Sequence, residues 1–309
     1  MRKNAAIAIS LVAILAVAGV AVAIVLTNDS DDKKYVYTTM SWQQEMVQEI
    51  VGDEYTVVSF LEANTNPHAT EITPGIIASR NTVAYFAVGS GVEWEETNLE
   101  IIRDQQGITT FECCEELIEL GVMDPLLEGE EHEGSEEGHD HATDPHVWAS
   151  PERLALIAEY VKDMMTELEP DNAAVFEAGC ASYRAKVDVL IGLEQEYLTG
   201  KATTEIIVWH PSWAYLLPDN VTEAELMEAA EAASTPSSIA MLQGGTPDNP
   251  INVFLSEPEQ INGLTQQALS RDMGIYVNII VINILAGDWV EYLGQVIVEL
   301  GDNIPDAGT

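Results

Sequence analysis

The stretch NAAVFEAGCASYRAKVDVLIGLEQEYLTG, residues 172 to 200, predicts one long helix near the middle of the chain. Apolar and aromatic side chains recur on one face of it, at Phe176, Cys180, Tyr183, Val187, Leu190 and Tyr197. A helix from residue 172 to 198 is about 40 Å long, and Gly200 closes it. A helix of this length is long enough to join two lobes.

Segments on both sides of this helix alternate between strand-like and helix-like patterns. The predicted strands are 34–39, 54–63, 82–88, 204–209, 251–255 and 276–282, and the other predicted helices are 41–52, 74–81, 151–168, 222–233 and 288–301. This alternation predicts an α/β fold of two lobes, each with a mostly parallel sheet. We expect an N-terminal lobe at 31–171, the connecting helix at 172–199 and a C-terminal lobe at 200–309.

The charge of the chain restricts its partners. It has 52 acidic and 12 basic residues among 309, a formal net charge of −40. Such a field repels phosphate backbones, so nucleic-acid binding is excluded, while cations are attracted. A solvated acidic coat is the simpler interpretation for most of these carboxylates.

The N-terminus contains an apolar run from residue 5 to 26, preceded by Arg2 and Lys3. At about 1.5 Å per residue this run spans roughly the core of a bilayer. The basic residues before it predict a cytoplasmic N-terminus and an extracytoplasmic remainder. We expect residues 1–30 to be an uncleaved membrane anchor, with a signal peptide cut after Ala21-Val22-Ala23 as the alternative.

The chain has three cysteines, Cys113, Cys114 and Cys180. A bond from Cys180 to one of the adjacent pair and three buried free thiols are both compatible with this pattern.

Three histidines stand beside prolines at the ends of predicted elements. His68 lies in NPHATEITP, His146 in DPHVW and His210 in VWHPSW. Proline stiffens a loop, and a metal site needs ligands that are held in place before the ion arrives. Imidazoles suit zinc, and three of them leave one position of a tetrahedral site open. The alternative at each position is a hydrogen-bonded structural histidine.

Five motifs, in their order and separation, resemble the solute-binding proteins of zinc and manganese ABC transporters, the ZnuA-like family. They are NPHATEITP, NTVAYFAVGSGVE, DPHVWASPERL, VWHPSW and SEPEQ, and the resemblance runs from about residue 35 to 300. It implies two α/β lobes on a long rigid helix, with the metal in the cleft between them.

The resemblance also implies the ligands. His68 and His146 would come from the N-terminal lobe and His210 from the C-terminal lobe. The family's fourth ligand is an aspartate in a DPL sequence after the last strand, but the matching segment here is INIL, with Asn283 at that position. Asparagine leaves the ion's charge uncompensated. We therefore expect water or Asn283 to complete the site, with a nearby acid such as Asp288 as the alternative, and the affinity to be lower than with aspartate.

A run of acidic residues, glycine and histidine occupies 128–143 and includes His132, His139 and His141. Zinc-selective members of the family have such a loop here, and imidazole ligands also favour Zn²⁺ over Mn²⁺. We interpret the loop as a weak metal-gathering site, with a plain solvated linker as the alternative. The resemblance makes Glu257 a candidate for contacting one of the metal-binding side chains without binding the ion itself.

These observations predict extracytoplasmic capture of a divalent metal and its delivery to an ABC permease. The predicted metal is Zn²⁺, with Mn²⁺ as the alternative. The sequence contains no ATPase motif and one apolar segment, so a separate permease and its ATPase subunit are implied. We predict no enzymatic activity. A zinc hydrolase with an open fourth position is the rival, and a surface adhesion module is a third interpretation.

Overall fold

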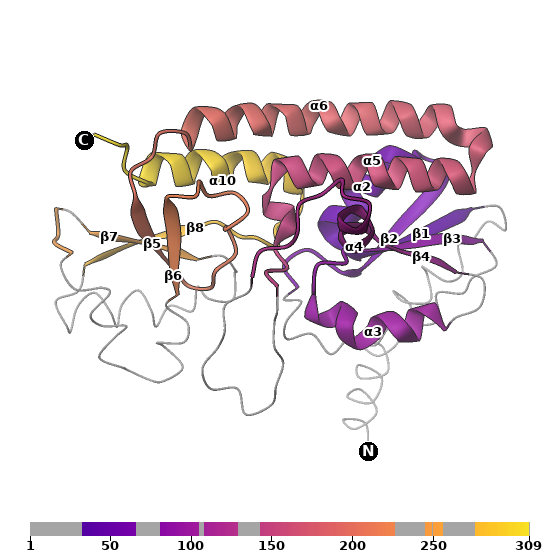
Figure 1. Ribbon diagram of the computed structural model, residues 1–309, viewed down its shortest axis with the longest axis horizontal. Coiled ribbons are helices and arrows are strands. Elements are labelled where there is room, and N and C mark those ends of the chain that lie inside the picture. Colours follow the sequence, from indigo (N-terminus) through magenta and orange to yellow (C-terminus); the bar gives the residue numbers. More distant parts are fainter. Residues whose placement is uncertain are drawn as a thin grey trace, which may run out of the picture.

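The computed structural model describes residues 33–65, 81–104, 108–128, 143–225, 245–248, 250–255 and 276–308. Within these ranges the chain forms two parallel four-stranded sheets, one in each lobe, with strand orders β2-β1-β3-β4 and β6-β5-β7-β8. Figure 1 shows the two sheets side by side beneath one long helix, α6. The predicted fold class is therefore confirmed.

The N-terminal lobe begins with alternating strands and helices. Its elements are β1 (Lys34–Met40), α2 (Ser41–Val51), β2 (Tyr55–Leu61), β3 (Thr82–Ala87), α3 (Glu93–Arg103), β4 (Thr109–Glu112) and α4 (Cys113–Glu119). Gly52 ends α2 with a φ of 74°, a conformation that glycine adopts without strain. Because the strands are parallel, the loops after β1, β2 and β3 lie at one edge of the sheet.

Two long helices pack against each other, and the longer one extends over both lobes. After the short helix η1 (Val147–Ala149), α5 (Pro151–Leu168) begins at Ser150, whose side chain accepts a hydrogen bond from the backbone N–H of Arg153. The turn η2 (Pro170–Asn172) then leads into α6 (Ala173–Tyr197). Helix α6 packs on α2 and α5 of the N-terminal lobe and on α10 (Trp289–Asn303) of the C-terminal lobe (Figure 1). One rigid element thus supports both lobes.

The C-terminal lobe repeats the parallel arrangement with β5 (Thr204–Val208), β6 (Val221–Glu225), β7 (Ile251–Leu255) and β8 (Val277–Val281). The predicted helix over 222–233 is wrong for its described part, because residues 221–225 form an edge strand paired with β5. Alanine and glutamate favour a helix locally, but pairing with β5 overrides that weak preference. Elements α3, β4 and α4 were not predicted.

The interior contains large aromatic side chains and the three thiols. Trp148 and Trp213 are fully buried, so both pack in the core. All three cysteines are buried and free, which leaves the free-thiol alternative. The apolar run 5–26 lies outside the described residues, and within the described part no helix is long and apolar enough to cross a membrane.

Candidate metal centre

His146 lies on a turn that connects the acidic run to α5, and its side chain is buried. The Asp144 carboxylate accepts two hydrogen bonds through Oδ1, from the His146 backbone N–H at 2.9 Å and from its Nδ1 at 2.7 Å. Burial alone would raise the pKa of Asp144, but the His146 ring beside it, with a smaller contribution from His210, holds that pKa below its usual range. With the proton on Nδ1, an ion would bind this ring through Nε2.

The turn G89-S90-G91 after β3 fixes the loop that contains His146. The Ser90 hydroxyl donates to the carbonyl of Pro145 at 2.8 Å, and the Thr143 hydroxyl donates to the carbonyl of Ser90 at 3.3 Å. Gly91 has a φ of 87°, and a Cβ there would lie 2.9 Å from the Thr143 hydroxyl oxygen. The glycine therefore lets two loops approach closely enough to hold His146 in place.

The buried carboxylate of Glu95 holds the turn at residues 89–91 by accepting hydrogen bonds from its backbone. Glu95 accepts hydrogen bonds from the backbone N–H groups of Val88 at 2.6 Å and Gly89 at 2.9 Å, and from the Thr39 hydroxyl. Burial raises the pKa of Glu95 above its usual range, although these donors oppose the shift.

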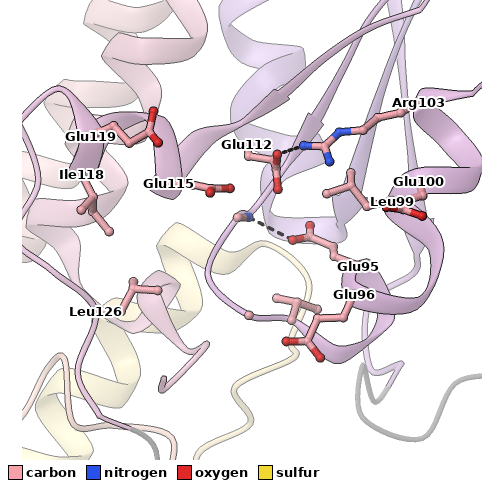
Figure 2. Close-up of a pocket in the computed structure, with 13 residues that line it drawn as sticks. Glu95, Glu96, Leu99, Glu100, Arg103, Glu112, Glu115, Ile118, Glu119 and Leu126 are labelled. Atoms are coloured by element: carbon pink, nitrogen blue, oxygen red, sulfur yellow. Dashed lines mark hydrogen bonds and ion pairs between the residues drawn. The ribbon is translucent and has the colours of Figure 1, made fainter. Parts of the chain in front are cut away.

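Glu95 also lines a pocket of about 540 Å³ on the N-terminal lobe (Figure 2). Most of the polar residues around the pocket are glutamates, and Arg103 is paired with Glu112. None of the predicted ligands lies in it, so this pocket is not the predicted metal site.

His210 follows β5 and approaches His146 from the other lobe. The two ring centroids are 5.4 Å apart and the ring planes are inclined by 69°. The backbone of the turn is fixed by Glu223, whose carboxylate accepts from the N–H groups of Ser212 at 3.1 Å and Trp213 at 3.2 Å. Oε1 of Glu225 lies 3.5 Å from Nδ1 of His210. The structure thus brings together two of the histidines that the sequence selected.

Asn283 lies after β8 and bonds across the lobes. Its Nδ2 donates to Oδ1 of Asn64 at 2.6 Å, while its own Oδ1 accepts from the backbone N–H of Leu285 at 3.0 Å. Its backbone N–H donates to the Tyr292 hydroxyl at 2.9 Å. The amide that would replace the family's aspartate therefore already has intramolecular partners on both its oxygen and its nitrogen.

The lobes also meet directly behind the histidines. Nε1 of Trp148 donates to the carbonyl of Ile284 at 3.0 Å, and Nε1 of Trp289 donates to the carbonyl of Trp148 at 2.8 Å. Tyr215 accepts from the N–H of Leu127 at 3.0 Å and donates to the carbonyl of Asp144 at 2.8 Å. Tyr215 of the C-terminal lobe thus holds both ends of the acidic segment.

The remaining predicted residues, His68, His132, His139, His141 and Glu257, lie outside the described residues. Among the residues that are described, no group of three or more His, Cys, Asp or Glu side chains is placed to hold a metal ion.

Sequence reasoning overlooked Asp144 and Glu225. The first could have been found from its position two residues before His146, where an aspartate readily bonds back to the turn. The second depends on β6 being a strand, which was predicted as helix.

Two parallel-sheet lobes on one long helix, with histidines of both lobes facing each other between them, define the architecture of a two-lobed solute-binding protein. Residues 36–298 match the family model described as "Zinc-uptake complex component A periplasmic". The chain belongs to this ZnuA family.

Curated relatives agree with this assignment. The zinc-binding lipoprotein AdcA of Streptococcus pneumoniae (strain TIGR4) is 26% identical over 261 residues, which cover 82% of this chain and 50% of the relative. The high-affinity zinc uptake system protein ZnuA of Bacillus subtilis is 28% identical over 61% of this chain and 59% of its own length. The chain spans about half the length of the first curated relatives it matches.

A crystal structure of ZnuA superposes with a TM-score of 0.68 at 23% identity, over 88% of this chain and 99% of that one. A Mn-bound point mutant of a periplasmic metal-binding protein from Candidatus Liberibacter asiaticus superposes with a TM-score of 0.61 at 17% identity, over 88% of this chain and 100% of that one. At these identities the likeness establishes the fold.

Proposed function

We propose that this protein captures zinc outside the cytoplasm and delivers it to an ABC-type permease for uptake. The observation that supports this most is the approach of His146 and His210 from opposite lobes, 5.4 Å apart between ring centroids. Neutral imidazoles are ligands that zinc prefers, and two rings on separate lobes enclose an ion between them. Membership of a family described as part of a zinc-uptake complex points the same way.

The proposed site consists of His68, His146 and His210, with water or Asn283 in the fourth position. Because the Asn283 oxygen already accepts from Leu285, water is the simpler fourth ligand. Manganese is the alternative cargo, but it prefers carboxylate and water to imidazole. The alternative of a zinc hydrolase is not retained, because a component of an uptake complex performs no chemistry on its solute.

The segments outside the described residues complete the proposal. His132, His139 and His141 form a weak gathering site whose acidic neighbours raise the local concentration of cations. Residues 5–26 tether the protein to the membrane, where the permease and its ATPase subunit would receive the ion.

Metal content tests the function. We expect the full chain, purified in detergent without a histidine tag, to hold one tightly bound zinc by mass spectrometry. His146→Ala should lose that zinc, whereas deletion of 129–142 should keep it and lose only weakly bound ions. Manganese or no metal in the parent, with His146→Ala behaving like the parent, would refute zinc capture. Loss of the tight ion on deletion of 129–142 would refute the role given to that segment.

A further inference from the structure

The histidines that meet between the lobes each have a carboxylate beside the same ring nitrogen. At His146 it is Asp144, whose Oδ1 lies 2.7 Å from Nδ1. At His210 it is Glu225, whose Oε1 lies 3.5 Å from Nδ1. The first comes from the same turn as its histidine, and the second comes from the neighbouring strand, β6. A carboxylate thus lies beside Nδ1 of both rings, hydrogen-bonded to it at His146 and slightly beyond hydrogen-bond distance at His210.

The Glu225 side chain is buried, unlike most acidic side chains. Its side chain is 6% exposed, and within the described residues neither carboxylate oxygen has a hydrogen-bond donor. Glu223, two residues earlier on the same strand, is by contrast bonded to the backbone N–H groups of Ser212 and Trp213. A buried carboxylate without donors is strongly unfavourable unless a positive charge compensates it. The group beside it is the ring of His210.

We infer that Glu225 is a positioning residue for the cargo ion, acting through His210. This inference rests on the proposed function. A carboxylate at Nδ1 fixes the proton there, so that Nε2 is the nitrogen offered to the ion, and it makes the imidazole a stronger donor. An ion bound at Nε2 in turn polarises Nδ1–H, which supplies positive charge beside a carboxylate that has no hydrogen-bond donor among the described residues.

This role also explains how the site works without the family's aspartate. Asn283 is neutral, so three histidines and a water would leave both charges of the ion uncompensated. Asp144 and Glu225 supply one negative charge on each side of the ion, through the rings they contact. The charge of the ion is therefore compensated by two carboxylates that contact its histidine ligands, in place of one carboxylate bound to the ion.

The test compares Glu225→Gln with Glu205→Gln, in the full chain. Glutamine keeps the shape of the side chain and removes its charge, and Glu205 is an exposed acid on the adjacent strand, so its variant removes the same charge away from His210. We expect Glu225→Gln to bind Zn²⁺ about 10- to 100-fold more weakly in competition with a chelator. Glu205→Gln should bind like the parent, and Glu225→Asp should recover part of the loss.

Spectroscopy separates positioning from direct ligation. The Co²⁺-loaded Glu225→Gln variant should keep the coordination number of the parent, because the ligands are unchanged. In the Zn²⁺-loaded parent, ¹H–¹⁵N NMR should show His210 metal-bound at Nε2 with a protected, deshielded proton on Nδ1. This second measurement needs no variant, so it decides the question even if Glu225→Gln fails to fold.

Three results would overturn the inference while the parent still binds zinc. The first is equal affinity of Glu225→Gln and Glu205→Gln, and the second is the absence of an Nδ1 proton on His210. The third is a lower coordination number in Co²⁺-loaded Glu225→Gln, which would make Glu225 a ligand itself. A parent that binds no zinc would instead refute the proposed function.

Discussion

The contact between α2 and α6 gives a prediction that the structure makes quantitative. At Gly179 of α6 the two helices are so close that a Cβ would lie 2.3 Å from the carbonyl oxygen of Glu49. The same Cβ would lie 2.6 Å from the carbonyl oxygen of Ile50 and 2.7 Å from its Cα. All three atoms are backbone, so no side chain can rotate away. Gly179→Ala therefore requires α2 to move off α6.

The expected magnitude follows from two opposing effects. Overpacking of this kind typically costs about 1–3 kcal/mol, and backbone contacts this short place the variant at the upper end. Alanine in place of glycine regains about 1 kcal/mol of helix propensity. We expect a net loss of about 2 kcal/mol in the free energy of unfolding.

Gly192 is the matched control, because it lies in the same helix and a Cβ there has no neighbour within 4 Å. Gly192→Ala should therefore gain about 1 kcal/mol from propensity alone. The two variants should differ by about 3 kcal/mol, or roughly 6–12 °C in Tm. Urea and thermal unfolding of the metal-free chain, followed by circular dichroism, measure the difference. Equal stability of the two alanine variants would refute the reasoning.

Two further substitutions test electrostatics. Burial, with a contribution from Glu152, raises the pKa of Glu194 to about 7. The folded protein thus holds this proton to higher pH than the unfolded chain, and stability falls as pH rises from about 4.5 to 7. Glu194→Gln should raise the free energy of unfolding by about 1 kcal/mol above pH 7, after discounting for solvent screening, and leave it unchanged below pH 4. Asn283→Asp should bind Zn²⁺ more tightly in isothermal titration, because it adds a negative charge where the family has its aspartate.

Each of these substitutions has a control in the same structure. Glu196→Gln removes an exposed charge two residues from Glu194 and should not change the pH dependence of stability. Asn64→Asp places a charge on the other member of the Asn64–Asn283 hydrogen bond, from the N-terminal lobe. Tighter binding by Asn64→Asp alone would show that the charge acts without regard to position 283. Equal or weaker binding by Asn283→Asp would contradict the expected cost of the missing aspartate.

Helices and central strands were predictable because their patterns are strong. Helix α6 was expected from residue 172 to 198 and runs from Ala173 to Tyr197, because its apolar face continues over its length. Helix α5 begins at Pro151, the first residue of the helix predicted over 151–168. The error at 222–233 lies at the edge of a sheet, where pairing with β5 decides the conformation and local propensity does not.

The site was predictable only in part, for a related reason. His146 and His210 were identified from the prolines beside them, and the structure brings their rings together. Their carboxylate partners follow from tertiary structure: Glu225 reaches His210 only because β6 pairs with β5. Residues next to each other in a sheet leave no signal in the spacing along a single chain.

The contacts behind the histidines constrain how an ion can enter and leave. Separating the lobes would break the hydrogen bonds that Trp148 makes with Ile284 and Trp289, all within buried surroundings. Each such bond is worth about 1 kcal/mol, and leaving a buried indole N–H or carbonyl unpaired loses about 1–3 kcal/mol. The turns that hold His146 and His210 are also held by several hydrogen bonds, among them that from Ser90 to Pro145 and those that Glu223 accepts from the backbone of the His210 turn. Opening the two lobes about α6 would therefore have to break the buried bonds of Trp148, whereas an ion that enters without such an opening leaves them in place.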